Sequence, residues 1–291
     1  MMNLTDMKTV KSILAKHGFH FSKKLGQNFL IDPSVCPRIA EMGNAAPGYG
    51  ILEIGPGIGT LTQQLALHAE RVTSVELDQR LLPILQETVG EFDNLHVLHG
   101  DILDFDIPQL LAQEFPGLRV AVCANLPYYI TTPILMHLLE SGAPVDTITV
   151  MVQKEVAEKL QAKVGTRDSG AITVAVNYYG AAELLFPVQR DSFLPPPNVD
   201  SAVLQIRVEQ RYAHMTDDPT HFFAMVKQGF SQRRKTLVNA LSATMHYEKS
   251  LLTGVLRELE LPETVRMENL TMEQLITLSN RLCQVDSGES I

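Results

Sequence analysis

Four segments rich in glycine or polar residues stand where apolar, strand-like runs of the sequence end. The first is the turn EIGPGIG at 53–59, the next two contain the acids Glu76 and Asp101, and the fourth is NLPY at 125–128. These residue types bind ligands through hydrogen bonds and through close backbone approach. The carboxyl ends of parallel strands share one edge of a sheet, so we expect the four segments to meet in one crevice.

The glycine turn narrows the choice of ligand. Gly55 and Gly57 let the backbone turn tightly and approach a ligand that a Cβ atom would block. Gly59 gives the spacing GxGxG rather than the GxGxxG of a dinucleotide site, and no GK[ST] follows as in a P-loop. GxGxG after an acid resembles the turn that binds S-adenosylmethionine, although a purely structural turn would also use glycines.

The two acids suit the adenosine part of such a ligand. Glu76 ends the second predicted strand, where a carboxylate can accept hydrogen bonds from both ribose hydroxyls. Asp101, followed by Ile102, can accept a hydrogen bond from the adenine amino group. Either acid alone is also typical of a helix cap or a surface charge. Their positions at successive strand ends favour binding of the cofactor.

The segment Asn125-Leu126-Pro127-Tyr128 resembles the [DNS]PP[YFW] motif of amino-methylating enzymes. The adenine N6 lone pair is delocalised, and acceptors at its N–H bonds return electron density to the nitrogen. The Asn125 side-chain oxygen and the Leu126 carbonyl can be those acceptors, Pro127 stiffens the turn, and Tyr128 can stack on the base. Transfer is then an in-line displacement that depends on positioning and needs no metal. The base must be extruded or unpaired. The alternative is a turn with a packed aromatic.

Strands and helices alternate along the first two thirds of the chain, which predicts an α/β fold with an open, Rossmann-like parallel sheet. Predicted strands lie at 50–54, 72–76, 95–99, 120–124 and 147–153, and predicted helices at 61–69, 79–89, 107–114 and 132–141. A short helix is expected at 5–17, before a basic loop. Two further β-rich runs, 171–179 and 202–209, predict antiparallel strands at one edge.

Helical patterns dominate after residue 209, at 222–230, 235–245, 249–259 and 272–282. We therefore predict two domains. Residues 1–207 form a catalytic, S-adenosylmethionine-binding domain with an N-terminal helical and basic extension. Residues 208–291 form a second, small, all-helical domain that binds RNA.

The net charge of −9 argues at first against nucleic acid. Basic residues nevertheless gather at 1–38 and 227–239, and such local charge can grip phosphates or simply be solvated. The candidates for RNA contact are Lys23, Lys24, Arg233, Arg234 and Lys235. Three scattered cysteines fit reduced thiols, and no metal-binding pattern is present. Because neither a secretory signal nor a membrane span is visible, we expect a cytoplasmic protein.

With these residues in hand, the sequence resembles the ribosomal RNA adenine dimethyltransferase family, and most closely its bacterial 16S branch, the KsgA-type enzymes. The resemblance covers nearly the whole chain. It is carried by KKLGQNFL at 23–30, EIGPGIGTLT at 53–62, VELD at 75–78, GDIL at 100–103, NLPYYIT at 125–131, QKEVAEKL at 153–160, FLPPPNVDSAV at 193–203 and FSQRRKTL at 230–237.

The resemblance implies further roles for residues. Asn28 and Leu30 close over the cofactor, and Phe193 covers the other face of the target base, whereas composition alone makes Phe193 a core residue. Gly55, Glu76, Asp101 and Asn125 match cofactor contacts, and the segment 125–128 matches the target-amine site. The implied substrate is two adjacent adenosines in a hairpin loop near the 3′ end of 16S rRNA, in the immature 30S particle. Each adenosine receives two methyl groups. The basic cluster at 233–235 contacts phosphates, and a monomer is expected.

Two alternatives remain open at this point. An Erm-like enzyme would share the α/β motifs and modify 23S rRNA instead. A non-catalytic ribosome-assembly factor would keep the fold without the chemistry, although intact Asn125, Tyr128, Glu76 and Asp101 argue against this loss.

Overall fold

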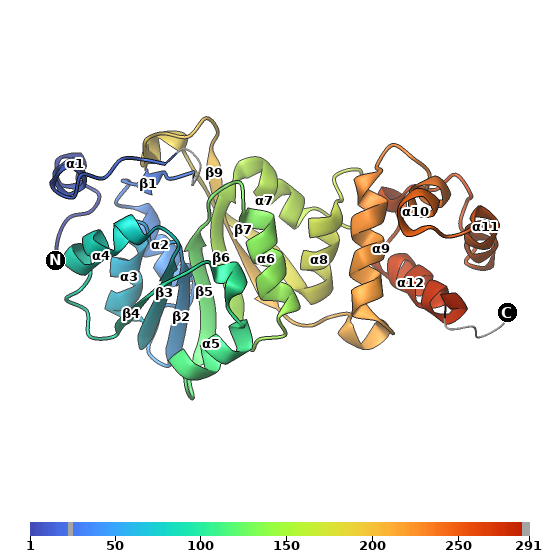
Figure 1. Cartoon of the computed structure of the whole chain (residues 1–291), viewed down its shortest axis with the longest axis horizontal. Helices are drawn as coiled ribbons and strands as arrows, with labels where there is room; N and C mark the ends of the chain where they lie inside the picture. Colours follow the sequence, from blue (N-terminus) through green and yellow to red (C-terminus); the bar gives the residue numbers. More distant parts are fainter. Residues whose placement is uncertain (23–25, 287–291) are drawn as a thin grey trace. The chain divides into compact units, whose positions relative to one another are not determined.

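The computed structural model describes residues 1–22 and 26–286, which form two compact units (Figure 1). The first unit comprises Met1–Ala157 and Ala182–Val208, and the second comprises Glu158–Ala181 and Glu209–Ile291. The division after Val208 lies beside the predicted boundary, but residues 158–181 group with the helical unit rather than with residues 1–207. The limits 1–207 and 208–291 of a catalytic and an RNA-binding domain stay a prediction.

A seven-stranded sheet in the order β4-β3-β2-β5-β6-β9-β7 forms the core of the first unit. The strands from β4 to β6 are parallel, and β9 runs antiparallel to β6. The strands are β2 (Tyr49–Ile54), β3 (Arg71–Glu76), β4 (Leu95–His99), β5 (Arg119–Asn125), β6 (Thr147–Gln153), β7 (Gly180–Val188) and β9 (Ser201–Val208). The five predicted parallel strands and the antiparallel strand predicted at 202–209 are therefore confirmed.

The strand order reverses between β2 and β5, because the chain builds β3 and β4 on one side of β2 and returns to place β5 on the other. Ligands of such sheets bind in the crevice beyond the strand ends at this reversal. Ile54 pairs with Ala124, so the segments that follow them start side by side. This register places the glycine turn next to the NLPY segment.

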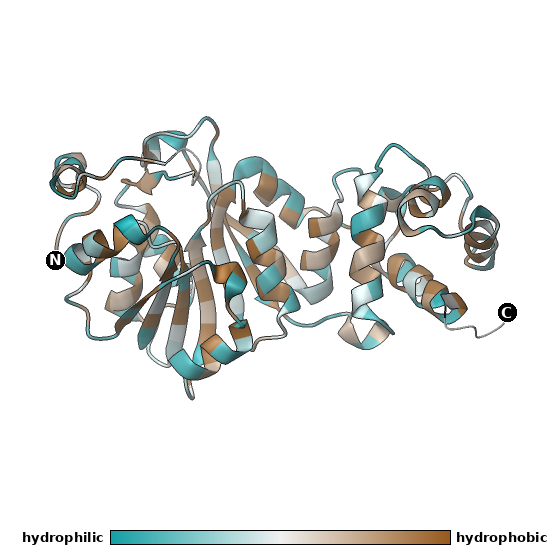
Figure 2. Cartoon of the chain, in the orientation of Figure 1, coloured by the Kyte–Doolittle hydropathy of each residue, from teal (hydrophilic) through white to brown (hydrophobic). Residues whose placement is uncertain are grey.

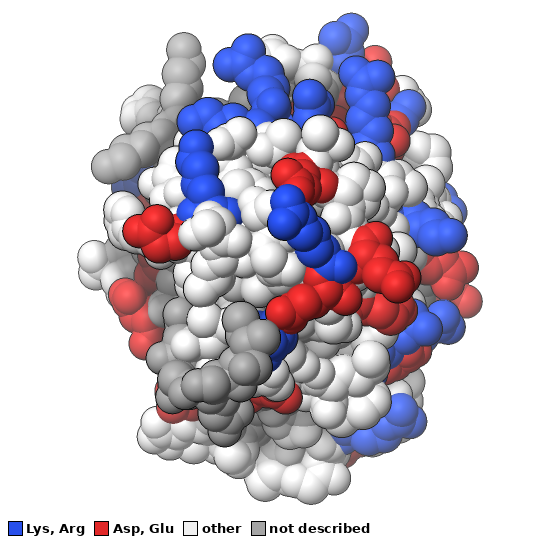
Figure 3. Space-filling view, turned by 90° about the vertical axis from the view of Figure 1, so that its right-hand side faces the viewer, with Lys and Arg blue, Asp and Glu red and all other residues white. Residues whose placement is uncertain are grey.

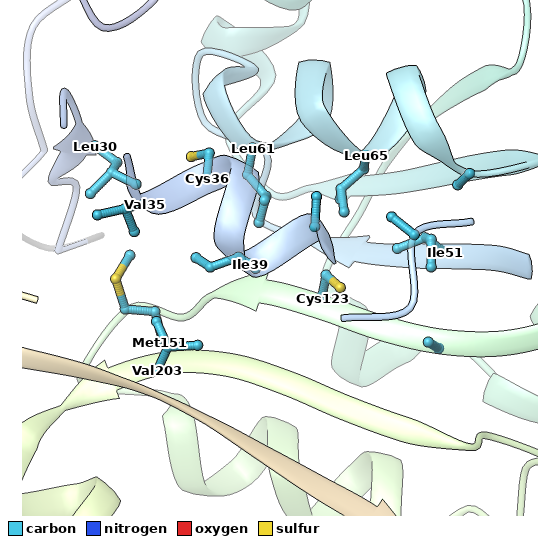
Figure 4. Packing of buried hydrophobic residues seen from close by; sticks show 14 of the residues in the cluster. Leu30, Val35, Cys36, Ile39, Ile51, Leu61, Leu65, Cys123, Met151 and Val203 are labelled. Carbon is cyan, nitrogen blue, oxygen red and sulfur yellow. The ribbon is translucent and has the colours of Figure 1, made fainter. Parts of the chain in front are cut away.

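Helices cover both faces of the sheet, and its central strands are apolar on both sides (Figure 2). One face packs against α2 (Val35–Met42) and α3 (Thr60–His68), where Ile39, Leu61 and Leu65 converge on Ile51 and Cys123 (Figure 4). The other face is marked by Gly50: a Cβ there would collide with Phe115, which follows α5 (Ile107–Glu114). Neighbouring residues of β2 thus serve opposite layers of helices.

The remaining helices of the first unit follow the predicted pattern. Their bounds are α1 (Met7–Lys16), α4 (Leu82–Thr88) after the short 3₁₀ turn Gln79–Leu81, and α6 (Thr131–Glu140). The N-terminal helix α1 is tied to α4 by Glu87, which accepts a hydrogen bond from Lys16 and pairs with His17. Helix α7 (Lys154–Gln161), which continues directly from β6, was not predicted.

One predicted strand is wrong. Residues 171–179 form helix α8 (Ala171–Tyr179), and the strand of this region is β7, which was not predicted. The run AITVAVNYY is rich in β-branched and aromatic residues, and most of the helix is buried. A helix buried nearly all round shows no polar face, so its pattern cannot be distinguished from that of a buried strand.

The second unit is helical. Besides α8 it contains α9 (Pro219–Ser231), α10 (Leu237–Met245), α11 (Lys249–Glu258) and α12 (Met272–Asp286), and these four confirm the predicted helices. Tyr178 of α8 stacks on Phe222 of α9, with ring centroids 5.2 Å apart. Helix α12 begins with a capping box, because Thr271 and Gln274 exchange hydrogen bonds. No helix in the described residues is long and apolar enough to cross a membrane.

We expect Gly50→Ala to lower the free energy of unfolding by about 1–3 kcal/mol, because the new methyl group must displace Phe115. Gly254→Ala is the matched control, since this glycine lies within α11 and a Cβ there meets no atom within 4 Å. It should stabilise its helix by about 0.5–1 kcal/mol. Urea denaturation followed by circular dichroism measures both changes, and equal effects at the two positions would contradict the packing argument.

Candidate active site

A pocket opens at the carboxyl ends of the parallel strands, and the residues predicted for the cofactor and the target amine line it together. They come from the N-terminal loop, the ends of β2, β3, β4 and β5, and strand β8. The lining includes Asn28, Leu30, Gly55, Gly57, Glu76, Asp101, Ile102, Asn125, Leu126, Pro127, Tyr128 and Phe193.

Two positions of the turn require glycine for different physical reasons. Gly55 has a φ of 70°, and a Cβ there would meet no atom within 4 Å, so the backbone faces open space in the pocket. Gly59 has a φ of 92° and begins α3, where a Cβ would lie 2.7 Å from Val89. Gly59 therefore serves close packing of α3, and Gly55 leaves room for a ligand.

Glu76 is held at the tip of β3 by the glycine turn itself. Its Oε2 accepts a hydrogen bond from the Gly57 N–H at 3.2 Å, and its Oε1 accepts one from the Asp78 N–H at 2.8 Å. Burial raises the pKa of Glu76 from 4.5 to about 7, although these backbone hydrogen bonds act in the opposite direction. The carboxyl is thus fixed in place and close to its titration point at neutral pH.

Asp101 is a capping residue and a pocket residue, and its contact with the cofactor stays a prediction. It caps the 3₁₀ turn Ile102–Asp104 by accepting a hydrogen bond from the Leu103 N–H at 3.0 Å. It also lines the pocket, as does Ile102.

The N-terminal loop is fastened to the end of β3 by residues that were not predicted. Gln27 donates a hydrogen bond to Asp78 at 2.7 Å, and Arg80 pairs with the same carboxylate at 2.6 Å. These contacts lower the pKa of Asp78, and the hydrogen bond from Arg80 has the largest effect. Arg80 also donates to the carbonyl oxygen of His20. The acid of the VELD segment gave a signal for a polar contact, but its partner Gln27 is distant in sequence and could not be inferred.

The NLPY segment leaves β5 with a sharp turn. The Leu126 N–H donates to the Met151 carbonyl, and the Pro127 carbonyl accepts from the Ile130 N–H and the Thr131 hydroxyl, at the start of α6. In contrast, the side chain of Asn125 and the carbonyl of Leu126 have no hydrogen-bond partner among residues 1–22 and 26–286. Two acceptors beside the glycine turn are therefore available to a ligand.

Two tyrosines follow with different environments. The Tyr128 hydroxyl lies 2.9 Å from the Ser201 hydroxyl at the start of β9, which fixes the ring. Burial raises the pKa of Tyr128, and it also raises that of Tyr129, with Asp101 and Glu76 adding to the second shift. Tyr129 is 53% exposed and lies beside Gly26 of the N-terminal loop.

Phe193 belongs to the core and to the pocket at once. It begins β8 (Phe193–Leu194), which pairs antiparallel with β1 (Phe29–Leu30). Its side chain is only 2% exposed and packs in the cluster shown in Figure 4, yet it also lines the pocket. The role of Phe193 against a target base stays a prediction.

The predicted RNA contacts fall elsewhere. Lys23 and Lys24 lie outside the described residues. Arg233, Arg234 and Lys235 lie in the turn between α9 and α10 and not on a helix, because α10 begins at Leu237. Arg233 is engaged within its unit: it pairs with Glu268 at 3.1 Å and donates to the Arg167 carbonyl at 2.7 Å.

The face drawn in Figure 3 bears charges of both signs. Arg234 and Lys235 are exposed. Among the described residues, no group of histidine, cysteine and acid side chains could hold a metal ion.

Similarity to known proteins identifies the family of this chain. The family described as ribosomal RNA adenine dimethylase matches residues 18–284. The chain belongs to this family. The ribosomal RNA small subunit methyltransferase A of Alkaliphilus oremlandii is 44% identical over 285 residues, which cover 98% of this chain and 99% of the relative. The enzyme of the same name from a Geobacillus species is also 44% identical and covers 94% and 96% of the two chains.

Solved structures confirm the predicted Rossmann-like methyltransferase fold. A dimethyladenosine transferase from Plasmodium falciparum superposes with a TM-score of 0.71 at 24% identity, covering 89% of this chain and 98% of its own. The 23S rRNA methyltransferase ErmE superposes with a TM-score of 0.62 at 28% identity, covering 88% of this chain and all of its own. The small-subunit relatives are thus considerably more similar in sequence than ErmE.

One buried acid of this rRNA adenine dimethylase site was noticed in the sequence only as part of the glycine motif. Glu53, at the end of β2, is 1% exposed, and its Oε2 accepts hydrogen bonds from Thr62 and Ser74. Burial raises its pKa from 4.5 to about 7, against the effect of these two bonds. Glu53 and Glu76 therefore both keep protons in the folded chain that they release in the unfolded chain between pH 4.5 and 7.

We expect the free energy of unfolding to fall as pH rises from about 5 to about 8. A carboxyl whose folded pKa is raised contributes stability below its unfolded pKa and loses it as pH passes the folded value, here about 7. Each acid can account for a change on the order of 3 kcal/mol. Glu53→Gln should remove the contribution of Glu53, so the free energy of unfolding should depend less steeply on pH. Urea denaturation at several pH values measures this dependence. An unchanged slope in this variant would refute the assignment to Glu53.

Proposed function

We propose that this protein transfers methyl groups from S-adenosylmethionine to N6 of two adjacent adenosines near the 3′ end of 16S rRNA. The observation that carries the proposal is the pair of unpartnered acceptors, the Asn125 side chain and the Leu126 carbonyl, in a pocket with the glycine turn. The names of the small-subunit relatives support the choice of 16S rRNA. The proposal includes the immature 30S particle as the substrate, a cytoplasmic location and action as a monomer.

The pocket fits S-adenosylmethionine by the chemistry of its lining. Gly55 leaves open space at the backbone, and the carboxyls of Glu76 and Asp101 match ribose hydroxyls and an adenine amino group. Asn28, Leu30, Gly57, Ile102 and Asn125 complete the proposed contacts. When bound, the cofactor supplies an electrophilic methyl group on a sulfonium.

Side-chain and backbone groups of this protein position and polarise the target amine. The oxygen of Asn125 and the Leu126 carbonyl accept hydrogen bonds from the N6 protons, which raises the electron density on the nitrogen. Tyr128, held by Ser201, offers a fixed ring for stacking on an extruded base. No general base is required, because the alkylated nitrogen is cationic and loses its proton readily.

Dimethylation sets a further demand on this pair of acceptors. A monomethylated N6 keeps one N–H, so the second transfer uses one of the two acceptors while the other faces the first methyl group. The pocket must therefore tolerate one unsatisfied acceptor during the second transfer. Leu30 and Phe193 give the same pocket an apolar lining, which suits a methyl substituent.

An Erm-like activity on 23S rRNA is the second candidate, supported by the structural likeness to ErmE. A role limited to ribosome assembly is the third. Incubation with methyl-labelled cofactor and undermethylated 30S particles, followed by mapping of the labelled adenines, separates them. Label on 16S N6 supports the proposal, label on 23S rRNA favours the second candidate, and no label from folded protein that binds the particle favours the third.

Asn125→Ala should reduce methyl transfer by at least about a hundredfold, because one of the two acceptors at N6 is removed. Cofactor binding should survive with a modest loss, since Glu76, Asp101 and the glycine turn are intact. Single-turnover transfer and calorimetric titration with S-adenosylhomocysteine measure the two effects. Activity within a few fold of the wild type would show that Asn125 is not an acceptor in the reaction.

The basic residues between α9 and α10 should differ in their effect on RNA binding. Replacing both Arg234 and Lys235 by Ala should weaken 30S binding and lower the slope of affinity against salt by about two, because each cation that neutralises a phosphate adds about one to the slope. Arg233→Ala should change this slope less and should lower the melting temperature, because Arg233 pairs with Glu268. Filter binding at several salt concentrations measures the slopes. A double variant with the wild-type slope would exclude a role of these two residues at the phosphates.

A further inference from the structure

Tyr129 differs from the other aromatic side chains that line the pocket. Phe29 and Phe193 are 6% and 2% exposed and belong to the core. The hydroxyl of Tyr128 lies 2.9 Å from that of Ser201, so this ring is held inside the pocket. Tyr129 is 53% exposed, and its hydroxyl has no hydrogen-bond partner in the part of the chain that the structure describes. A single exposed apolar side chain is ordinary on a protein surface, but this ring also lines the candidate active site and is open to a ligand.

The turn between β5 and α6 holds Tyr129 in place before any ligand binds. The carbonyl of Pro127 closes the turn by accepting hydrogen bonds from the Ile130 N–H at 3.2 Å and the Thr131 hydroxyl at 3.1 Å. One edge of the Tyr129 ring lies beside the N-terminal loop: a Cβ atom at Gly26 would be 3.6 Å from Cδ1 and 3.9 Å from Cε1. A ring that is fixed in this way loses little conformational freedom when a partner stacks on it.

The charges beside Tyr129 favour an uncharged partner. Burial raises the pKa of its hydroxyl, and the carboxyls of Asp101 and Glu76, which follow β4 and end β3, raise it further. A phosphate group at this position would be repelled by the same carboxyls. A nucleobase carries no charge and has a flat face that stacks on aromatic side chains. The surroundings of the ring therefore suit a base rather than the sugar–phosphate backbone of an RNA.

We propose that Tyr129 stacks on the base of the adenosine that adjoins the target adenosine in the RNA chain. The proposal rests on the proposed function, since that substrate has two adjacent adenosines. An adenosine extruded into the pocket leaves one face of the neighbouring base uncovered. Tyr128 and Tyr129 are consecutive, with Cα atoms about 3.8 Å apart, so their rings are within reach of consecutive nucleotides. Tyr129 thus replaces the stacking contact that extrusion breaks, and it takes no part in polarising N6.

Steady-state methylation of undermethylated 30S particles tests the role of the ring. Tyr129→Ala should lower kcat/KM by about fivefold to about a hundredfold, mostly through KM, because stacking holds the substrate and the transition state equally. Tyr129→Phe keeps the ring and should stay within about twofold of the wild type. Leu184→Ala is the matched control, because Leu184 on β7 is 44% exposed and does not line the pocket. Its kinetics should equal those of the wild type.

A change in the RNA identifies the base that Tyr129 contacts. Reconstituted 30S particles are prepared in two forms, each with an abasic site in place of one of the two adenosines. With wild-type protein, transfer to the remaining adenosine should fall in at least one form by a factor similar to that of Tyr129→Ala. With Tyr129→Ala, the same abasic site should have little further effect, because the ring and the base are partners in one contact. A variant that merely disturbs the turn would instead lose activity equally on all particles.

Additive losses in this cycle would overturn the inference, as would a wild-type kcat/KM in Tyr129→Ala. Calorimetric titration with S-adenosylhomocysteine is a further check, because Tyr129→Ala should bind it as tightly as the wild type. A loss of that affinity large enough to explain the loss of activity would place the ring on the cofactor and refute the proposal. Failure of the folded wild type to methylate any particle would instead sink the proposed function. If Tyr129→Ala does not fold, the wild type decides: undiminished transfer to both abasic particles would refute a contact with the neighbouring base.

Discussion

The structure depends on the side-by-side pairing of β2 and β5. Ile54 and Ala124 are neighbours across this pair, and the two strands are followed by segments of opposite chemistry. The turn after β2 consists largely of glycines, which leave open space beside the backbone. The turn after β5 instead presents a side-chain amide and a backbone carbonyl that have no hydrogen-bond partners among the described residues. Neither segment would make a site on its own. The strand order alone brings the two segments together, because β3 and β4 are added on one side of β2 and β5 is added on the other.

The free-energy cost of this arrangement comes mainly from the burial of two acidic side chains. Glu53 and Glu76 are both buried at the strand ends, and burial disfavours their charged forms. Hydroxyls from Thr62 and Ser74 and backbone N–H groups from Gly57 and Asp78 offset part of the cost. The stability to carry the remainder comes from the apolar layers on the two faces of the sheet, including the layer of α2 and α3 over β2 and β5. Part of this packing, from Ile39, Leu61 and Phe193, also lines the pocket.

The sequence predicted the sheet well, because strands buried on both faces are short apolar runs bounded by turns. It predicted most of the pocket lining for the same reason, since the glycine turn, the acids and the NLPY segment each follow such a run. The error at 171–179 arose where burial on all sides removed the periodic signal. Gln27 was missed because only the tertiary fold brings it to Asp78, and the contact of Arg80 with the carbonyl oxygen of His20 is equally distant in sequence. Arg233 was predicted as an RNA contact from local charge and from the family resemblance, and only the structure reveals its pairing with Glu268.

The ribbon of β1 and β8 links the segment that precedes α2 to the segment that precedes β9, through only two residues on each strand. So short a ladder contributes few hydrogen bonds, and the buried side chains of Phe29, Leu30 and Phe193 hold the two segments in place instead. Because the same three residues line the pocket, the ribbon joins the hydrophobic core directly to the pocket wall. A substitution that loosens this packing would therefore change the shape of the pocket as well as the stability of the fold.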